Sequence, residues 1–211
     1  MAVKSSFINM TLCLLAICLV CSGLLAGVYA LTKEPIDAAA KAKNEAAILE
    51  VLPEAAATIE EERTVDYEGA TYTYNLAYDE KGEVVGCAVN VAPVGFGGPI
   101  LIKVGFKVNA QTGEHIIWNT KVLSQAETPG LGAKCVEPAF AAQFKELDPA
   151  AKKLSVKKDG GDIDAITAST ITSRAYVAGV AIAVNVLATI QGTPMLIDTA
   201  SGASSVETVN E

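Results

Sequence analysis

Residues 171–190 read ITSRAYVAGVAIAVNVLATI, and Ala, Val, Ile and Leu fill most of these positions. A helix that is apolar around most of its circumference has to be buried, because no side of it is suited to water. We therefore expect these residues to form a long helix that is largely buried against a sheet.

The chain before this helix alternates apolar and polar residues with a period of two, which is typical of β-strands. Turns that contain Gly or charged residues separate the alternating runs. The expected strands are residues 70–78, 83–91, 100–108 and 115–123. A helix at 138–147 and an edge strand at 154–157 are expected to follow. Together these elements predict an α+β domain, in which a small antiparallel sheet packs against helices.

The N-terminal region differs in composition from the rest of the chain. Asp, Glu, Lys and Arg are absent between Ser5 and Thr32. The apolar block at residues 7–31 exceeds the ~20 residues that a helix needs to cross the hydrocarbon layer, and also the ~7–15 residues typical of a signal-peptide core. We therefore expect a single N-terminal transmembrane helix. Cleavage is the alternative, since residues 28–30 (VYA) resemble a processing site.

The charges that flank this span differ little, with Lys4 and the amino terminus on one side and Lys33 on the other. The positive-inside tendency favours a cytoplasmic N-terminus, which puts the domain on the extracytoplasmic side of the inner membrane. An Ala-, Lys- and Glu-rich neck follows, and Pro53 is expected to end its helix. The predicted organisation is a cytoplasmic N-terminus and anchor at 1–32, a helical neck at 33–62, the domain at 63–191 and a flexible tail at 192–211.

The charged and reactive residues exclude several functions. Lys and Arg number 16 against 24 Asp and Glu, for a net charge of −8, and no basic stripe indicates a nucleic-acid partner. His115 is the only histidine, so a Ser-His or Cys-His nucleophile pair has no support and we predict no catalytic residue. Cys13 and Cys18 project about 140° apart on a helix. With Cys21 they are expected to line the span as small apolar residues, and no metal site is predicted.

A cluster of hydroxyl side chains precedes the long helix. Residues 164–173 read DAITASTITS, with five Ser or Thr between Thr167 and Ser173. One of them is enough to cap the helix by accepting a hydrogen bond from a free amide, and this simple interpretation needs no ligand. The same amides and the helix dipole also suit a phosphate. Residue chemistry leaves both interpretations open.

Two glycine-containing loops accompany this cluster. Residues 95–98 read GFGG, and residues 127–132 read ETPGLG. Glycine lets the backbone approach a flat ligand closely, because it has no Cβ. Each loop by itself is more typical of an ordinary turn.

Taken together, the N-terminal span, the two loops and the hydroxyl cluster resemble one family, the FMN-binding G subunits of the Rnf electron-transport complexes. The C subunit of the sodium-pumping NADH:quinone reductase shares their flavin domain. In this family a flavin transferase recognises Asp, two residues, Ser or Thr, usually Gly, usually Ala, and then Thr. The pattern falls on Asp164, Thr167, Ala168, Ser169 and Thr170, with Ala and Ser in place of the usual Gly and Ala. The resemblance implies that Thr170 carries FMN through a phosphoester.

The resemblance also implies which residues surround the flavin. Asp164, Thr167 and Thr170 belong to the signal that the transferase recognises. The expected cofactor-binding residues are Thr170, Thr167, Ser169, Ile171, Thr172, Glu127, Thr128, Gly130, Leu131, Gly97 and Gly98.

The function implied by the resemblance is electron transfer within a membrane-bound, ion-translocating ferredoxin:NAD oxidoreductase of the Rnf type. FMN carries the redox chemistry and the protein positions it. The implied partners are the other subunits, including membrane flavin and iron–sulfur subunits, a flavin transferase and the lipid bilayer. Two alternatives stay open: a stand-alone, membrane-anchored extracytoplasmic flavin reductase, and a non-redox binding module whose hydroxyl cluster only caps a helix.

Overall fold

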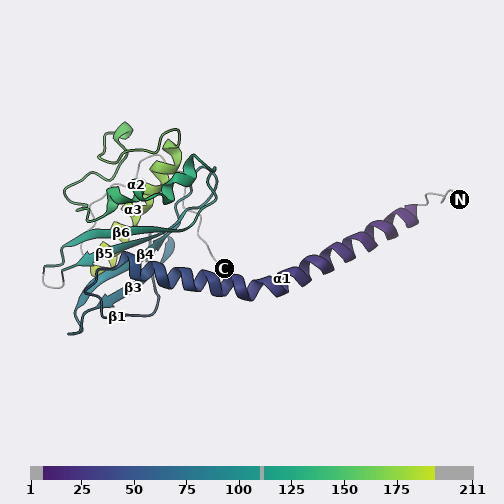
Figure 1. Cartoon of the computed structure of the whole chain (residues 1–211), viewed down its shortest axis with the longest axis horizontal. Coiled ribbons are helices and arrows are strands. Elements are labelled where there is room, and N and C mark those ends of the chain that lie inside the picture. The colour runs from purple at the N-terminus through teal and green to yellow at the C-terminus, as the bar shows by residue number, and fades with distance from the viewer. Residues whose placement is uncertain (1–6, 110–111, 193–211) are drawn as a thin grey trace. The chain divides into compact units, whose positions relative to one another are not determined.

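The apolar N-terminal segment belongs to one long helix, α1 (Phe7–Val51). The computed structural model describes residues 7–109 and 112–192 (Figure 1). The chain divides into two compact units, Met1–Asn44 and Glu45–Glu211, so the last turns of α1 belong to the second unit. Apart from Gly192, the predicted flexible tail lies outside the described residues.

In the first unit, α1 exposes its apolar side chains from Phe7 to Leu31. The helix is long and apolar enough to cross a membrane. Pro35 lies inside it and has no backbone amide to donate, yet the helix continues past it. No break in the helix separates the predicted anchor from the predicted neck, and the domain boundaries at residues 32 and 62 stay predictions.

Six strands form an antiparallel sheet in the second unit, with the order β1-β3-β4-β5-β6 and with β2 also paired to β3. The strands are β1 (Thr58–Ile59), β2 (Arg63–Tyr67), β3 (Ala70–Tyr78), β4 (Val84–Val91), β5 (Leu101–Val108) and β6 (His115–Ser124). The predicted α+β fold with an antiparallel sheet is confirmed. The sequence analysis did not predict β1 and β2 as strands: β1 has only two residues, and the alternation in β2 is short and leaves Val65 and Tyr67 only half-buried.

The predicted buried helix is confirmed as α3 (Thr170–Gln191), which packs on the sheet through the main core of the domain. This helix is also apolar and long enough to cross a membrane, but 89% of its most apolar stretch is buried inside the domain. A Cβ on Gly179 would lie 2.6 Å from the Pro93 ring. The helix therefore lies directly against the loop that follows β4.

The end of α1 packs against the opposite face of the sheet. Ile48 and Val51 contact Ala77 and Ala88 in a second, smaller apolar cluster. Successive residues of a strand point to opposite faces, so a strand such as β4 contributes to both clusters. A Cβ on Gly105 would lie 1.8 Å from the Val51 carbonyl oxygen. Only glycine at this position lets the helix end lie on β5.

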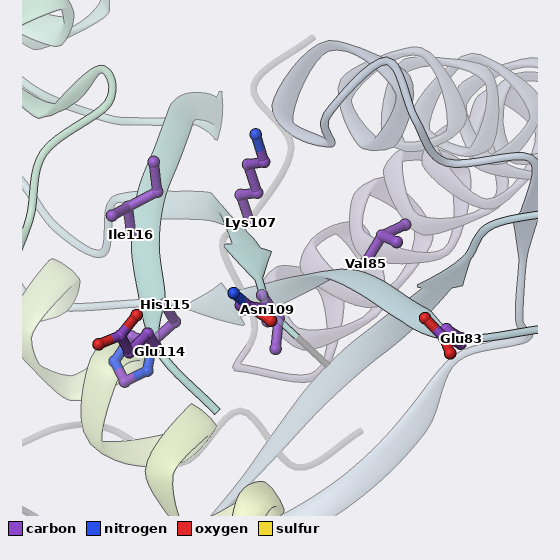
Figure 2. A pocket seen from close by; sticks show the side chains of 8 residues that line it. Glu83, Val85, Lys107, Asn109, Glu114, His115 and Ile116 are labelled. Atoms are coloured by element: carbon purple, nitrogen blue, oxygen red, sulfur yellow. The ribbon is translucent and has the colours of Figure 1, made fainter. Parts of the chain in front are cut away.

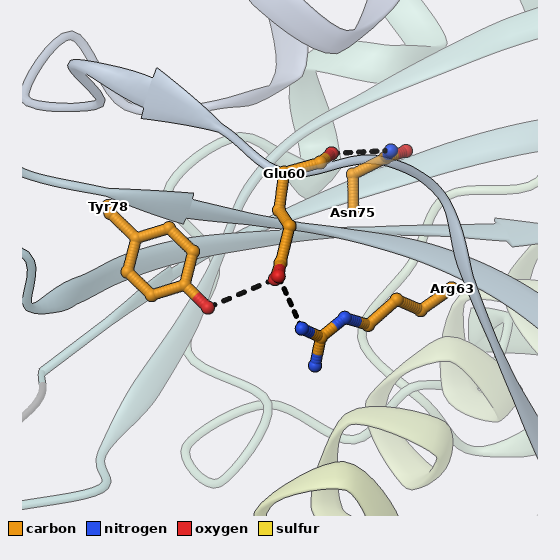
Figure 3. A network of polar contacts seen from close by, with 4 residues as sticks. All are labelled: Glu60, Arg63, Asn75 and Tyr78. Atoms are coloured by element: carbon orange, nitrogen blue, oxygen red, sulfur yellow. Dashed lines mark hydrogen bonds and ion pairs between the residues drawn. The ribbon is translucent and has the colours of Figure 1, made fainter.

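Polar contacts of Glu60 tie the segment between β1 and β2 to β3 (Figure 3). The Tyr78 hydroxyl donates to Glu60 Oε2 at 3.0 Å, and Asn75 Nδ2 donates to the Glu60 carbonyl at 3.2 Å. Arg63 forms an ion pair with the same carboxylate. These bonds hold two short strands that bury little apolar surface.

The region between β6 and α3 contains only short helices. They are η1 (Gly132–Val136), α2 (Pro138–Ala141), η2 (Ala142–Phe144) and η3 (Lys157–Asp159). The helix predicted at 138–147 is thus confirmed in part, since it ends at Phe144. The edge strand predicted at 154–157 is wrong: Val156 forms one isolated bridge with Ile163, and a turn through Gly160 (φ 78°) reverses the chain at once.

Lys103 in β5 is fully buried, and its Nζ has no hydrogen-bond partner among the described residues. Burial lowers the pKa of Lys103 from its ordinary value of 10.5 to about 8, an effect that Glu62 partly offsets. The folded chain therefore holds a poorly solvated ammonium at neutral pH.

We expect Lys103→Met to stabilise the protein by about 2 kcal/mol at pH 7, because it removes a buried charge at similar volume. Between pH 8 and 10.5 the unfolded wild type binds more protons at this residue than the folded wild type does, so wild-type stability rises relative to the variant as pH increases. Denaturant unfolding of both proteins at pH 7 and pH 10 measures the difference. A stability difference that is equal at both pH values contradicts the prediction.

Candidate functional site

Three segments of the chain meet at the N-terminal end of α3 and enclose a cavity of about 390 Å³. The lining residues are Phe96, Glu127, Thr128, Leu131, Gly132 and residues 168–172. The cavity brings together the two glycine-containing loops and the hydroxyl cluster, which are far apart in the sequence.

Glu127 joins these three segments. The residue is buried, with 5% of its surface exposed. Oε1 accepts a hydrogen bond from the Gly97 amide at 3.0 Å, and Oε2 accepts one from the Thr172 hydroxyl at 2.8 Å. One buried side chain therefore fixes the glycine loop before β5 and the first turn of α3.

Glycines make room for this carboxylate. A Cβ would lie 2.1 Å from Glu127 Oε1 if it were added to Gly95, and 2.3 Å from Oε2 if it were added to Gly132. At Gly97 a Cβ would meet the Ala126 carbonyl oxygen at 2.2 Å. The glycines thus serve the close approach of the loops to Glu127.

The start of α3 has no side-chain cap within the described residues. Ser169 occupies the N-cap position but makes no capping hydrogen bond. The first helical hydrogen bond runs from the Ser173 amide to the Ser169 carbonyl. The amides of Thr170, Ile171 and Thr172 therefore have no acceptor in the part of the chain that the structure describes. The capping interpretation of the hydroxyl cluster does not fit this geometry.

The hydroxyls of the cluster have other contacts. The Ser173 hydroxyl donates to the Ser169 carbonyl and accepts from the Ile166 amide, both at 2.9 Å. The Thr172 hydroxyl bonds Glu127, as described above. Thr170 Oγ1 accepts a hydrogen bond from Lys158 Nζ at 3.1 Å. Ser173 and Thr172 thus shape the loop, while the Thr170 hydroxyl lies at the cavity wall.

Ala168 adopts a left-handed backbone conformation with φ of 60°. This conformation costs most L-residues ~1–2 kcal/mol, while glycine adopts it freely. The sequence motif usually has Gly at this position. The structure therefore explains the preference through the backbone rather than through side-chain volume.

We expect Ala168→Gly to stabilise the chain by ~0.5–1 kcal/mol, since the relief of strain exceeds the added entropy of the unfolded state. A rise of the thermal midpoint, measured on the full chain in detergent, checks this. Ala165→Gly is the matched control, because Ala165 is absent from the positive-φ residues and packs against the core, and we expect it to destabilise. A destabilised Ala168→Gly protein contradicts the prediction.

The structure places most, but not all, of the predicted site residues at the cavity. Those that line it are Glu127, Thr128, Leu131, Ser169, Thr170, Ile171 and Thr172. Thr167, Gly130, Gly97 and Gly98 do not line it, although Gly97 contacts it through Glu127. Asp164 lies elsewhere, in an ion pair with Lys157 at 2.7 Å.

The residues expected individually to bind the cofactor did not include Phe96, Gly132, Ala168 or Lys158, although the resemblance placed the loops 95–98 and 127–132 near the flavin. The first three lie inside the quoted loops and motif, so closer attention to exposed apolar and small residues there could have found them. Lys158 belongs to no motif, and its contact with Thr170 depends on how the chain folds back.

Cys135 lies in η1, three residues after the cavity residue Gly132, and is fully buried. Burial, with a smaller contribution from Glu127, raises the pKa of Cys135 to about 11. The thiol is therefore protonated at neutral pH, and the reactive thiolate is not available.

A larger hollow of about 530 Å³ lies at the β5–β6 hairpin (Figure 2). Glu83, Lys107, Glu114 and His115 are among its lining residues. None of the predicted site residues lines it, and it contains charged side chains of both signs, with Glu83 and Glu114 in loops and Lys107 in β5. The smaller cavity at α3 is the better candidate site, because it gathers a buried carboxylate, free amides and apolar side chains.

The matches to known proteins cover this cavity and the N-terminal helix. A model of the FMN-binding domain matches residues 95–185, and a model of the RnfG N-terminal region matches residues 1–51. The G subunit of the ion-translocating oxidoreductase complex of Methanosarcina acetivorans is 34% identical over 164 residues, which are 75% of this chain and 84% of that protein. This chain belongs to the RnfG family.

A bacterial relative agrees with this assignment. The G subunit of the same kind of complex in Shewanella piezotolerans is 33% identical over 197 residues, which are 85% of this chain and 89% of that protein. The RnfG family inferred from the motif is therefore confirmed. Among solved structures, the C subunit of the Na⁺-translocating NADH-quinone reductase of Parabacteroides distasonis is 22% identical, with 64% of this chain and 75% of that chain covered and a TM-score of 0.40.

Proposed function

We propose that this chain is the electron-transfer subunit of a membrane-bound, ion-translocating oxidoreductase complex of the Rnf type, and that it carries FMN through a phosphoester on Thr170. The observation that carries the proposal is the cavity at the start of α3, where a hydroxyl, free amides and an apolar rim converge. The matched FMN-binding domain spans the whole cavity, and the relatives named above are complex subunits.

The start of α3 suits the phosphate of FMN. The amides of Thr170, Ile171 and Thr172 have no acceptor within residues 7–109 and 112–192. Unpaired amides and the positive end of the helix dipole stabilise an anion. A phosphate esterified to Thr170 Oγ1 is bonded directly to the first of these residues.

The rim of the cavity suits the flavin ring. Phe96, Leu131 and Ile171 line it and are 70%, 43% and 53% exposed. Large apolar side chains gathered around a cavity are typical of a ligand or partner surface. A flavin ring placed among them buries apolar area, and Glu127 and Thr128 supply polar groups at the wall. When bound, FMN supplies the redox chemistry, while these residues bind and orient it.

The proposed setting follows from α1 and the motif. We propose an inner-membrane location with the flavin domain on the extracytoplasmic side, and the other subunits, including membrane flavin and iron–sulfur subunits, as electron partners. A flavin transferase would recognise Asp164, Thr167 and Thr170. Asp164 and Thr167 are exposed, so both are accessible to such an enzyme.

The intact mass of the full chain, purified from cells with an active transferase, tests the attachment. We expect the mass of the chain plus one FMN moiety, and flavin fluorescence that stays with the band after denaturation. An unmodified mass of the chain from such cells contradicts the proposed covalent attachment. Extraction in mild detergent tests the complex: a chain that always separates from the other subunits indicates the stand-alone reductase instead.

A further inference from the structure

We propose that Lys158 is the charge partner of the FMN phosphate, a role that no part of the attachment motif assigns. The inference rests on the proposed function, because it concerns the phosphate that Thr170 would carry. Lys158 lies in η3 and before the motif begins, and it reaches the attachment residue through the fold.

Lys158 contacts the oxygen atom of Thr170 that would form the ester. Lys158 Nζ donates to Thr170 Oγ1 at 3.1 Å. In a phosphate esterified to that oxygen, the other phosphate oxygens are bonded to phosphorus and lie two bonds from Oγ1. An ammonium group has three N–H donors on a flexible stem, so it can follow the phosphate and keep a charge-assisted hydrogen bond.

A second ion pair positions η3 beside the helix. Arg174 Nε and an Nη of Arg174 each donate to Asp159 at 2.7 Å, a two-bond pairing that joins α3 to the residue after Lys158. Arg174 lies one helical turn beyond Thr170 and hence on the same side of α3. Arg174 lowers the pKa of Asp159 below its ordinary value, which keeps the pair ionised at neutral pH. The ion pair between Arg174 and Asp159 therefore holds Lys158 beside Thr170.

The same turn also contacts the other end of the motif. Lys157 Nζ bonds Asp164 Oδ2 at 2.7 Å. Both side chains are well exposed, so this pair contributes little stability. Neighbouring lysines thus contact the two residues that the motif requires at its ends, with Lys158 on the flavin side.

The charge balance of the cavity calls for such a cation. A phosphodiester on Thr170 brings a negative charge into a cavity that already contains the buried Glu127 carboxylate. None of the residues that line the cavity is Lys or Arg. Two negative charges at close range repel each other, and a nearby cation offsets this repulsion. Lys158 supplies that charge from just outside the lining.

Two flavins that differ only in the phosphate test the proposal. The full chain is purified in detergent from cells that lack the transferase, and is titrated with FMN and with riboflavin. We expect the wild type to bind FMN more tightly than riboflavin. Lys158→Ala should raise the Kd for FMN about five- to tenfold and change the Kd for riboflavin by less than about twofold. Lys158→Arg keeps the charge and should restore FMN affinity.

Lys152→Ala is the matched control, because it removes an exposed lysine of the same segment whose side chain forms no hydrogen bond or ion pair with a described residue. We expect it to bind both flavins as the wild type does. Equal weakening of FMN and riboflavin by Lys158→Ala overturns the proposal, since it indicates a structural effect. Unchanged FMN affinity, or a wild type that does not prefer FMN, overturns it as well.

The flavin titration tests the role of Lys158, and the mass measurement tests the covalent attachment, so either claim can be refuted while the other holds. A wild type that discriminates FMN through Lys158 but never gains mass in cells with transferase refutes the covalent attachment and leaves a phosphate site. A wild type that gains mass while Lys158→Ala has no effect on FMN binding leaves the attachment and refutes the role of Lys158.

Discussion

Thr170→Ala is expected to lose covalent FMN completely and to remain folded. The substitution removes the oxygen that forms the ester. Thr170 is the first residue of α3 rather than its N-cap, so no capping bond is lost. Among the described residues, the only side-chain hydrogen bond removed is the one from Lys158, and alanine is a good helix former. We expect the free energy of unfolding to change by less than about 1 kcal/mol.

Intact mass and in-gel flavin fluorescence measure the loss, and thermal unfolding measures the fold. Ser169→Ala and Thr167→Ala are the matched controls and should keep the flavin. Ser169 is only 7% exposed, and Thr167 does not line the cavity, so neither hydroxyl competes well with Thr170. Covalent flavin on the Thr170→Ala chain would move the attachment to one of these two residues.

Glu127→Ala is expected to destabilise the domain by about 3 kcal/mol and to lower flavin occupancy. The alanine leaves the Gly97 amide and the Thr172 hydroxyl without their acceptor, and hydrogen bonds to a charged acceptor contribute ~1.5–3 kcal/mol each. Relief of the buried charge offsets part of the loss. The glycine loop and the first turn of α3 also lose their common contact, so the cavity loses its shape.

Glu127→Gln is the sharper comparison. Its amide oxygen can accept from the Gly97 amide, while its NH₂ donates to the Thr172 hydroxyl, which is able to act as an acceptor. We expect this variant to lie within about 1 kcal/mol of the wild type. Denaturant unfolding and flavin occupancy by mass compare the two. If Glu127→Ala unfolds at the wild-type denaturant concentration, Glu127 does not hold the three segments together.

Thr170 and Glu127 differ in how easily their roles can be predicted from the sequence. Thr170 is recognisable because the motif around it is continuous from Asp164 onward. Glu127 was expected near the flavin only through the family resemblance. Its bonds to Gly97 and Thr172 link positions 30 and 45 residues away, and no local pattern records such pairings.

The helices and strands also differ in how well the sequence predicts them. The alternation at β3 to β6 and the apolar length of α3 predicted those elements closely, because each pattern repeats within the element itself. The edge strand expected at 154–157 failed because Val156 has a single partner, Ile163, before the chain turns at Gly160. Strands β1 and β2 were not predicted because their patterns are too short: β1 has two residues, and β2 places only Val65 and Tyr67 against the core.

The sequence by itself determined the apolar N-terminal helix, the α+β class, the buried final helix and the family motif that ends at Thr170. Each of these depends on periodicity or on a contiguous run of residues. Only the tertiary structure decided that Glu127 joins three segments, that Ala168 is held at positive φ, and that Lys158 contacts Thr170. The physical reason is that these features depend on which distant segments share the small space at the start of α3, and that is decided by packing of the whole domain.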